Sequence, residues 1–254
     1  MKKLFLVLIS SIGFLAHSYA QQPKPTPTPT PTGPQVVDTT PKAWQIGVGS
    51  SQKELSVTFD QRMNPGFTAW MGRSSLVPQL DLNTKISEDR STFSLHVDLL
   101  PGKVYVFGLN EKKLPGVGFQ NERGQAAPPY FLVFQTAGNP APDDAPPRVA
   151  STIPTNNAQQ LDPSRLKSVT IVFDKPMLTA KHGLHMVENK REVDLSKAKF
   201  QYSADGKSFI LGYDFKPSTV YEFQLNNTQD IGFVSAKRVP LWPVGFAFST
   251  GSPR

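Results

Sequence analysis

The sequence of 254 residues contains no cysteine. This absence excludes disulfide bonds, a thiol nucleophile, cysteine-based metal centres and a lipid attached to cysteine. A chain without these covalent links must be stabilised by burying apolar surface. Its length is sufficient for two domains of ordinary size.

The sequence patterns of common enzymes are also missing. There is no G-x-S-x-G motif and no P-loop, and the glycine pairs at 47–49 and 116–118 lack the third glycine of a dinucleotide-binding loop. Beyond residue 20 the histidines are His96, His182 and His185. His182 and His185 are spaced like a metal pair, but no acidic set accompanies them, so we interpret them as surface or structural residues. The sequence predicts neither catalytic residues nor a cofactor.

Long apolar runs are scarce, and the one at the N-terminus has a specific context. Lys2 and Lys3 precede the apolar stretch Leu4 to Leu15, and Ser18-Tyr19-Ala20 follows as a small-x-small site. This order is typical of a secretory signal peptide, although an ordinary amphipathic or core helix is the alternative. The stretch is too short to span a bilayer of about 30 Å. We predict a signal peptide over residues 1–20, no membrane-spanning segment, and export to the periplasm, the cell surface or the medium.

Proline is concentrated after this segment, in QQPKPTPTPTPTGPQ at residues 21–35. Alternating proline and threonine favour an extended polyproline II conformation. Such a segment acts as a semi-rigid spacer with a rise of about 3.1 Å per residue. An inert disordered leader is the alternative interpretation.

One phrase occurs twice. LSVTFDQRM at residues 55–63 is nearly repeated as VTIVFDKPM at 169–177, which places Phe173 114 positions after Phe59. Tyr105 and Tyr221 continue the match at an offset of 116, and Phe134 and Phe248 are again 114 apart. So small a drift over about a hundred residues indicates a duplicated unit. We predict domains at 36–138 and 147–254, joined by a Pro-rich linker at 139–146.

Within each unit the apolar residues alternate with polar ones. Leu55, Val57 and Phe59 illustrate this period of two, which is typical of half-buried strands. Around Asp205-Gly206 the alternation predicts a β-hairpin. Several short strands per hundred residues predict an all-β protein with two tandem Ig-like β-sandwich domains. In it Phe59 and Phe173 point inward, and Met63 and Met177 close one end of each core.

These residues resemble a known family. The pattern V-x-x-T-x-P, a strand ending F-D-x-x-M, then L-x-P-G-x-x-Y and a closing F-x-T-x-G is similar to the bacterial Ig-like module of the SbsA type, named from an S-layer protein. The second copy, from PPRVASTIP onward, matches best, whereas the first departs at AWQIGVGSSQKE. The resemblance implies β-sandwiches that serve as spacers, adhesive units or appendages of exported proteins, and it implies no particular reaction.

The net charge of +7 is unevenly distributed. Residues 36–138 contain ten Lys and Arg against nine Asp and Glu, whereas residues 147–254 contain fourteen against nine. Many of these cations lie between Lys181 and Lys199, interspersed with acids. That pattern argues against a nucleic-acid stripe. For an exported protein we therefore expect an envelope polymer or protein as the partner.

Three further features are candidate binding elements. Trp70 and Trp242 are hypothetical ligand-binding residues because exposed indoles stack on sugar rings, with core packing as the alternative. Asp143 and Asp144, with the repeated Asp60 and Asp174, suggest a calcium site at the domain junction, with a solvated linker as the alternative.

The sequence thus predicts an exported, non-enzymatic structural or adhesive protein of the bacterial cell envelope. The first alternative is a binding protein for a carbohydrate or an anionic polymer, using the tryptophans and the basic second half. A more distant alternative is an enzyme or inhibitor built on sandwich loops.

Overall fold

The computed structural model describes residues 33–66, 70–72, 79–110 and 118–252. The predicted signal peptide and nearly all of the Pro-Thr spacer lie outside these residues. Every regular element in the described ranges is a β-strand, and none of these ranges contains a helix that could cross a membrane. The predicted all-β, Ig-like fold class is confirmed.

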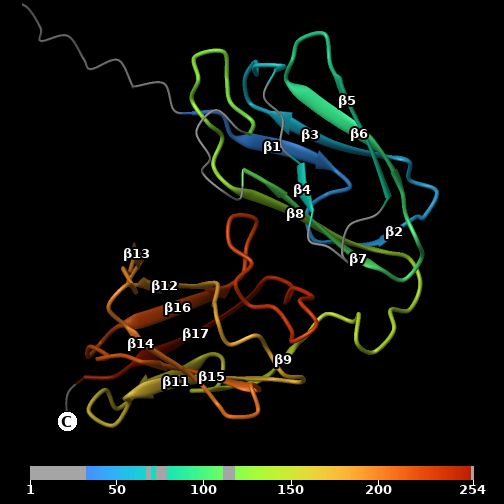
Figure 1. The fold of residues 1–254 in the computed structure, drawn as a ribbon. Helices are drawn as coiled ribbons and strands as arrows, with labels where there is room; N and C mark the ends of the chain where they lie inside the picture. The colour runs from blue at the N-terminus through green and yellow to red at the C-terminus, as the bar shows by residue number, and fades with distance from the viewer. Residues whose placement is uncertain (1–32, 67–69, 73–78, 111–117, 253–254) are drawn as a thin grey trace, which may run out of the picture. The chain divides into compact units, whose positions relative to one another are not determined.

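The first repeat forms two four-stranded sheets, drawn from blue to green in Figure 1. One has the order β1 (Val36–Thr40), β3 (Glu54–Phe59), β6 (Thr92–Asp98), β5 (Gln79–Ile86). The other has the order β2 (Gln45–Val48), β8 (Tyr130–Thr136), β7 (Val104–Leu109), β4 (Trp70–Gly72).

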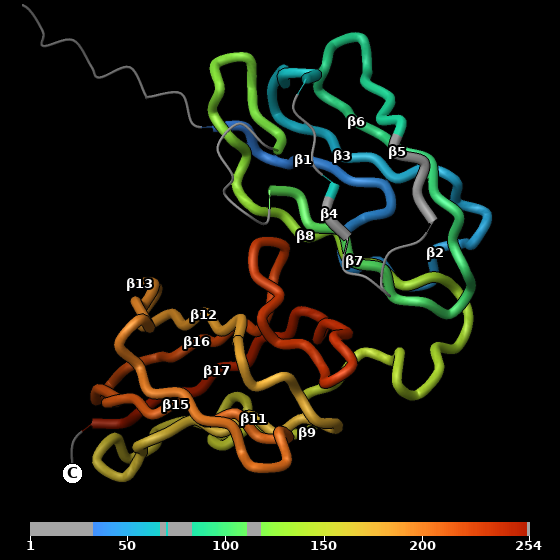
Figure 2. Tube along the Cα trace, viewed as in Figure 1, coloured from blue at the N-terminus to red at the C-terminus, as the bar shows by residue number. Residues whose placement is uncertain are grey.

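The second repeat, drawn from yellow to red in Figure 2, has the same topology with one added strand. One sheet has the order β9 (Val149–Ile153), β11 (Ser168–Phe173), β15 (Ser208–Gly212), β14 (Lys199–Tyr202). The other has the order β10 (Ala158–Leu161), β17 (Val244–Thr250), β16 (Val220–Leu225), β12 (Leu184–Glu188), β13 (Arg191–Glu192). Strand pairs are antiparallel except β2 with β8 and β10 with β17, which are parallel.

Alternating side chains build the core of each repeat. Phe59 and Phe173 are each 2% exposed, and Met63 and Met177 are buried beside them, which confirms the predicted inward positions. The predicted hairpin is present as β14 and β15, which pair Phe200 with Leu211 across the Asp205-Gly206 turn.

Three polar contacts recur at equivalent positions in the two repeats. The hydroxyl oxygen of Tyr105 accepts a hydrogen bond from the Leu100 amide at 2.8 Å, and Tyr221 does the same for Lys216 at 2.6 Å. Such a contact fixes the corner before a late strand. The carboxylates of Asp60 and Asp174 accept hydrogen bonds from the amides of Gln35 and Arg148, so the repeated aspartate anchors the first strand of each repeat.

A buried asparagine is the third recurring contact. Asn110 donates to the carbonyl oxygens of Phe119 and Ala127, both at 2.8 Å, and accepts from the Phe119 amide. Asn226 makes the same three bonds in the second repeat. Both asparagines have a positive φ, near 53°, which asparagine tolerates better than most residues. Each therefore holds a strand end to the following loop.

Among the described strands, no sheet combines members of both repeats. The contacts nevertheless group residues 33–254 into one compact unit. The boundaries 36–138, 139–146 and 147–254 therefore remain a prediction.

Strand β7 departs from the alternation seen in the sequence. Tyr105, Phe107 and Leu109 face the core as expected, but Val104 and Val106 are also buried, at 2% and 0% exposure. At the equivalent position in β16, Val220 is 48% exposed and Glu222 is exposed. One outer face of the first repeat is thus covered, and its counterpart in the second is open.

Candidate functional site

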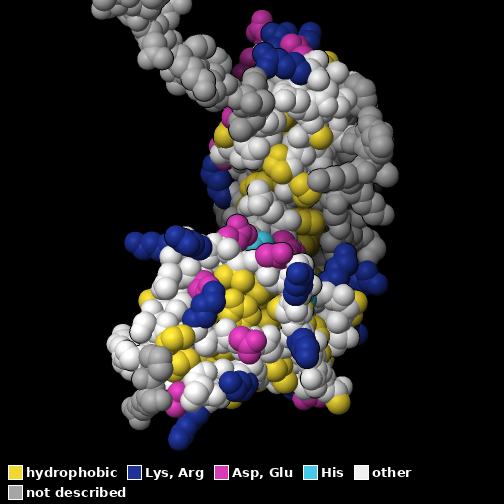
Figure 3. All heavy atoms as spheres, turned by 90° about the vertical axis from the view of Figure 1, so that its left-hand side faces the viewer, with side chains coloured by type: hydrophobic (Ala, Val, Ile, Leu, Met, Phe, Trp, Pro, Cys, Tyr) yellow, Lys and Arg dark blue, Asp and Glu magenta, His cyan; other side chains and the backbone are white. Residues whose placement is uncertain are grey.

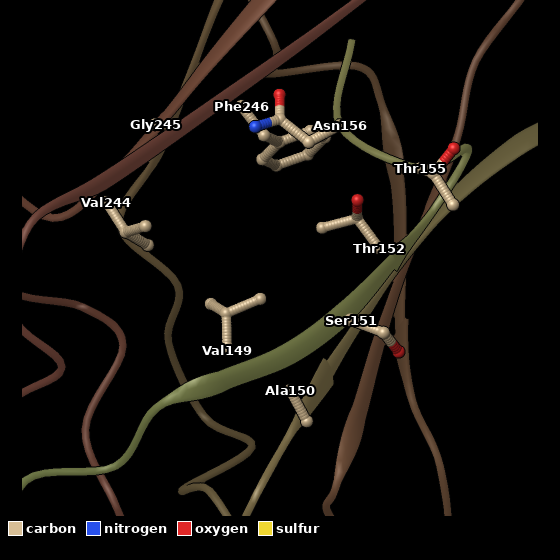
Figure 4. A pocket seen from close by; sticks show the side chains of 9 residues that line it. All are labelled: Val149, Ala150, Ser151, Thr152, Thr155, Asn156, Val244, Gly245 and Phe246. Carbon is tan, nitrogen blue, oxygen red and sulfur yellow. The ribbon is translucent and has the colours of Figure 1, made fainter. Parts of the chain in front are cut away.

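One apolar feature of the second repeat is a groove between its two sheets. It has a volume of about 310 Å³ and lies between β9, the edge strand of one sheet, and the first residues of β17. Figure 4 shows Val149 and Thr152 of β9 across the groove from Val244 and Phe246 of β17, with Asn156 at the rim. No charged side chain lines it. The groove is therefore suited to a neutral, apolar group.

In the first repeat a tyrosine occupies the equivalent position. Tyr130 begins β8 as Val244 begins β17, and it packs against both apolar clusters of that repeat. Its hydroxyl hydrogen-bonds the Thr39 side chain, and burial raises the pKa of the Tyr130 hydroxyl. Thr152 is the counterpart of Thr39, but Val244 has neither the length nor the hydroxyl to reach it. Replacement of tyrosine by valine thus accounts for the open groove.

The strand edge beside the groove also differs between the repeats. In β8 the Phe131 amide donates to the carbonyl oxygen of Thr228 at 2.6 Å, and the Val133 carbonyl accepts from the Trp44 amide. In β17 the Ala247 carbonyl accepts from the Asn157 amide at 2.7 Å, which matches the Val133 contact. Gly245, the counterpart of Phe131, has no hydrogen-bond partner for its outward amide among the described residues.

An apolar cluster joins the two repeats. The second repeat contributes Ile231 and Val239, and the first contributes four buried residues of β7 and β8: Val104, Val106, Phe131 and Val133. Trp44 and Trp242 pack against this cluster. Their two rings meet edge to face, with centroids 5.6 Å apart. The covered face of β7 is therefore the contact surface between repeats.

Both predicted ligand-binding tryptophans have packing partners. Trp242 is half-buried at the junction, where its Nε1 donates to the Trp44 carbonyl oxygen at 3.0 Å. Trp70, on β4, meets the rings of Phe107 and Phe119 edge to face at 6.5 and 5.7 Å. Its Nε1 is buried and has no described hydrogen-bond partner. The structure therefore does not bring the two indoles to a common site.

The acidic residues of the linker pair with lysines. The Asp144 carboxylate lies 2.5 Å from Lys103 Nζ of the first repeat, and Asp143 lies 3.4 Å from Lys237 Nζ of the second. Lys175 Nζ donates to the carbonyl oxygens of Pro142 and Ala145. In the described part of the chain, no three His, Asp or Glu residues gather in a way that could hold a metal.

His182 and His185 lie in different environments. The His182 ring packs against the Phe200 ring in a tilted arrangement, with centroids 3.9 Å apart. Burial lowers the pKa of His182, and the nearby Asp230 partly opposes this shift. His185, on β12, has its Nε2 3.8 Å from the Asp230 carboxylate. His182 thus takes part in the packing of this aromatic cluster.

A basic groove of about 580 Å³ lies on the sheet of the second repeat that contains β14, β15 and β11. Its cations are Lys167, Lys197, Lys199 and Lys216, and its acids are Asp194 and Asp214. Lys216 Nζ pairs with Glu188 at 2.5 Å, whereas the other three lysines have no ion pair with a described residue. Gly212 of β15 pairs with Lys199 of β14 on one side and with Ser168 of β11 on the other, and it adds no side chain to the groove.

The surface of Figure 3 shows how the remaining charges are arranged. Lysine and arginine side chains on this face form several small separate groups, with acidic side chains beside some of them. A continuous basic stripe of the kind that follows a nucleic-acid backbone is absent from this view. The lysine groove is therefore a local feature.

Sequence reasoning did not identify the groove beside β17 or the contact surface of β7. Both depend on differences between the aligned copies. The sequence alignment of the two repeats places Val244 opposite Tyr130 and Glu222 opposite Val106. Comparing outward positions of the two copies, in addition to their shared core, would have indicated both.

The comparisons with known proteins concern mainly the second repeat. Residues 143–250 match the model of the bacterial Ig-like domain. This match covers less than half of the chain, and it does not distinguish the SbsA type. No curated protein sequence matches the chain.

Similar solved structures include CopC from Methylosinus trichosporium OB3b, at 10% identity and a TM-score of 0.32 over 42% of this chain and 94% of that one. The S-layer protein rSbsC(31-844) aligns at 13% identity and a TM-score of 0.29 over 86% of this chain and 26% of that one. The titin fragment I67-I69 aligns at 12% identity and a TM-score of 0.28, covering 88% and 66%. These TM-scores are too low to carry an argument about function.

Proposed function

We propose that this chain is an exported, non-enzymatic structural or adhesive protein of the bacterial cell envelope. The observation that carries the proposal is the apolar cluster between the repeats, in a chain whose second half matches a bacterial Ig-like domain. Buried valines on β7, packed against Ile231 and Val239, hold two sandwiches together without disulfides. The ion pairs of Lys103 and Lys237 fix the linker to both repeats. A protein built this way transmits force or holds a spacing between its ends.

The test is the fate of the full chain in bacteria. When it is expressed with its own N-terminus, we expect mass spectrometry to find a mature chain that begins at Gln21. We further expect fractionation to place it with the envelope, outside the inner membrane. An uncleaved chain in the cytoplasm would overturn the proposal. Replacement of Leu4 to Leu15 by a polar sequence is the matched control that should retain the protein inside.

A second candidate function is binding of an anionic envelope polymer. It is supported by the three lysines of the basic groove that have no described ion pair, Lys167, Lys197 and Lys199. Cations that are not paired internally remain available to carboxylate or phosphate groups of a polymer. Salt would weaken such binding, because exposed charges are screened within about 10 Å at 0.1 M.

Co-sedimentation with alginate and with polyphosphate tests this candidate. We expect the mature protein to be retained at low salt and released at high salt. Exchange of Lys167, Lys197 and Lys199 to Glu should reduce retention about tenfold. A control exchange of Lys85, Arg123 and Lys207 to Glu makes the same change in net charge elsewhere. Equal loss in both variants would contradict a specific groove.

A further inference from the structure

Two features of the second repeat coincide at one strand end. The outward amide of Gly245 has no described partner, and the neutral groove of about 310 Å³ lies beside it. The outward direction follows from the register of β17 with β16. Because Ala247 bonds to Asn156 and Asn157 on the outer side, Gly245, two residues away, also presents its backbone groups outward.

The first repeat shows which groups can bind to the strand-edge amide and fill the groove. The Phe131 amide donates a hydrogen bond to the carbonyl oxygen of Thr228, which belongs to a loop of the second repeat. The space beside it is filled by the Tyr130 side chain, whose hydroxyl bonds to Thr39. In the first repeat a backbone carbonyl therefore accepts the hydrogen bond of the strand-edge amide, and an aromatic ring fills the space between the sheets. Both groups belong to the same chain.

In the second repeat neither contribution comes from the described residues. Val244 leaves the groove open, and Thr152, the counterpart of Thr39, lines it with its side chain (Figure 4). A side chain at position 245 would point out of the plane of the sheet, so it would not block the approach of another backbone to this edge. A Cβ at Gly245 would meet only ordinary contacts, with the Phe223 carbonyl oxygen at 3.4 Å and Gln224 Oε1 at 3.5 Å.

We propose that Gly245 and the groove between β9 and β17 form a docking site for an extended peptide segment of a protein partner. One carbonyl of the segment accepts a hydrogen bond from the Gly245 amide, and one of its amides donates to the Gly245 carbonyl. A tyrosine or phenylalanine side chain of the segment enters the groove. The segment carries no charge there, because the lining carries none. Strand addition of this kind uses main-chain hydrogen bonds for affinity and a side-chain pocket for specificity. The proposal does not depend on the envelope role.

The peptide Ac-Thr-Tyr-Thr-NH2 is a defined probe for this site, with Ac-Thr-Ala-Thr-NH2 as its control. We expect titration of the isotope-labelled mature chain with the tyrosine peptide to shift the Gly245 amide and the Val149 and Val244 methyl signals saturably. The dissociation constant should lie near 1 mM, since only one ring and about two hydrogen bonds contribute. The alanine peptide should bind at least tenfold more weakly. Absence of saturable shifts, or equal binding of both peptides, would overturn the proposal.

Three variants separate the two parts of the site. Val244→Tyr copies the first repeat, so it should abolish binding and raise the melting temperature. Gly245→Pro removes the amide, and edge positions accept proline, so the variant should fold and bind about tenfold more weakly. Gly245→Ala keeps the amide and should bind as the unmodified chain does, read from the methyl signals. Undiminished binding by Val244→Tyr or by Gly245→Pro would contradict the assignment.

Discussion

The indole Nε1 of Trp242 donates a hydrogen bond to the carbonyl oxygen of Trp44 at 3.0 Å, across 198 positions of sequence. The two rings also meet edge to face at the margin of the apolar cluster that joins the repeats. Aromatic pairs in this geometry contribute beyond the area they bury. This pair therefore couples the stability of one sandwich to that of the other.

Trp242→Ala should lower the free energy of unfolding by about 2 to 3 kcal/mol, below the value for a fully buried aromatic because Trp242 is half-buried. It should also move the unfolding transitions of the two repeats further apart in calorimetry. Trp242→Phe keeps the ring contact but loses the hydrogen bond, so it should have a smaller effect. An unchanged unfolding profile in the alanine variant would show that the junction does not couple the repeats.

Asn226→Ala should be among the most destabilising substitutions in the second repeat. It removes three hydrogen bonds from a side chain with 0% exposure and leaves the Phe233 amide and two carbonyls without partners. Each unsatisfied buried group costs about 1 to 3 kcal/mol, so we expect a loss of at least about 3 kcal/mol in urea titration.

Asn189→Ala is the control for Asn226→Ala. Asn189 also has a positive φ, but its side chain accepts a single bond, from the exposed Val220 amide. We expect a loss of about 1 kcal/mol there. Similar losses in the two variants would indicate that backbone conformation, and not the buried bonds, sets the cost.

His182 should make stability depend on pH. Burial against Phe200 lowers the pKa of His182 in the folded chain, so the unfolded chain binds more protons below its own pKa of about 6.5. Stability is therefore complete above about pH 6.5 and falls as the pH is lowered through the folded pKa. We expect His182→Phe to flatten this decline in urea titrations between pH 7.5 and 5. An NMR pKa for His182 at or above its ordinary value would contradict the prediction.

Phe59→Ala should cost about 3 to 5 kcal/mol, since the ring is buried in the core of the first repeat. Hydrogen exchange should show the loss of protection mainly in β1 to β8. In the second repeat it should extend only to the segment that carries Ile231, Val239 and Trp242, which the first repeat covers. Uniform loss of protection through β9 to β17 would instead show one cooperative unit.

Calcium is expected to leave the melting temperature unchanged. Asp143 and Asp144 each face a lysine ammonium group, which competes with a cation for the carboxylates. Differential scanning fluorimetry with 5 mM calcium and with EDTA is the measurement. A rise in melting temperature with calcium that Asp144→Asn removes would instead support the calcium hypothesis.

The fold was predictable because its determinants are local. Alternation in β3 and β11, the Asp-Gly turn before β15 and the offset between Phe59 and Phe173 are all visible in short windows. The fully buried β7 was not, because a valine facing outward looks the same in sequence whether a neighbour covers it or not. Its cover comes from Ile231 and Val239, more than a hundred residues later.

The candidate site was harder to predict than the fold because it depends on what is missing from a repeated pattern. Tyr130 and Val244 align in the two copies, yet only the structure shows that the ring fills a space between two sheets. The prediction that Trp70 and Trp242 bind ligands rests on the general tendency of exposed indoles to stack on sugar rings. In the structure, Trp70 on β4 takes the place that Leu184 holds on β12, and both pack into their cores.

Glu222 is exposed at the position of the second repeat that corresponds to the buried Val106 of the first. The two repeats therefore do not present the same surface to a neighbouring module. The first sandwich offers an apolar face that receives another module, and the second offers a charged one at the same location. A third module joined by the same geometry would have to bury that carboxylate, which costs several kcal/mol without a compensating partner. Duplication of the gene segment alone therefore does not generate an array. Lengthening the series would require this surface to change first.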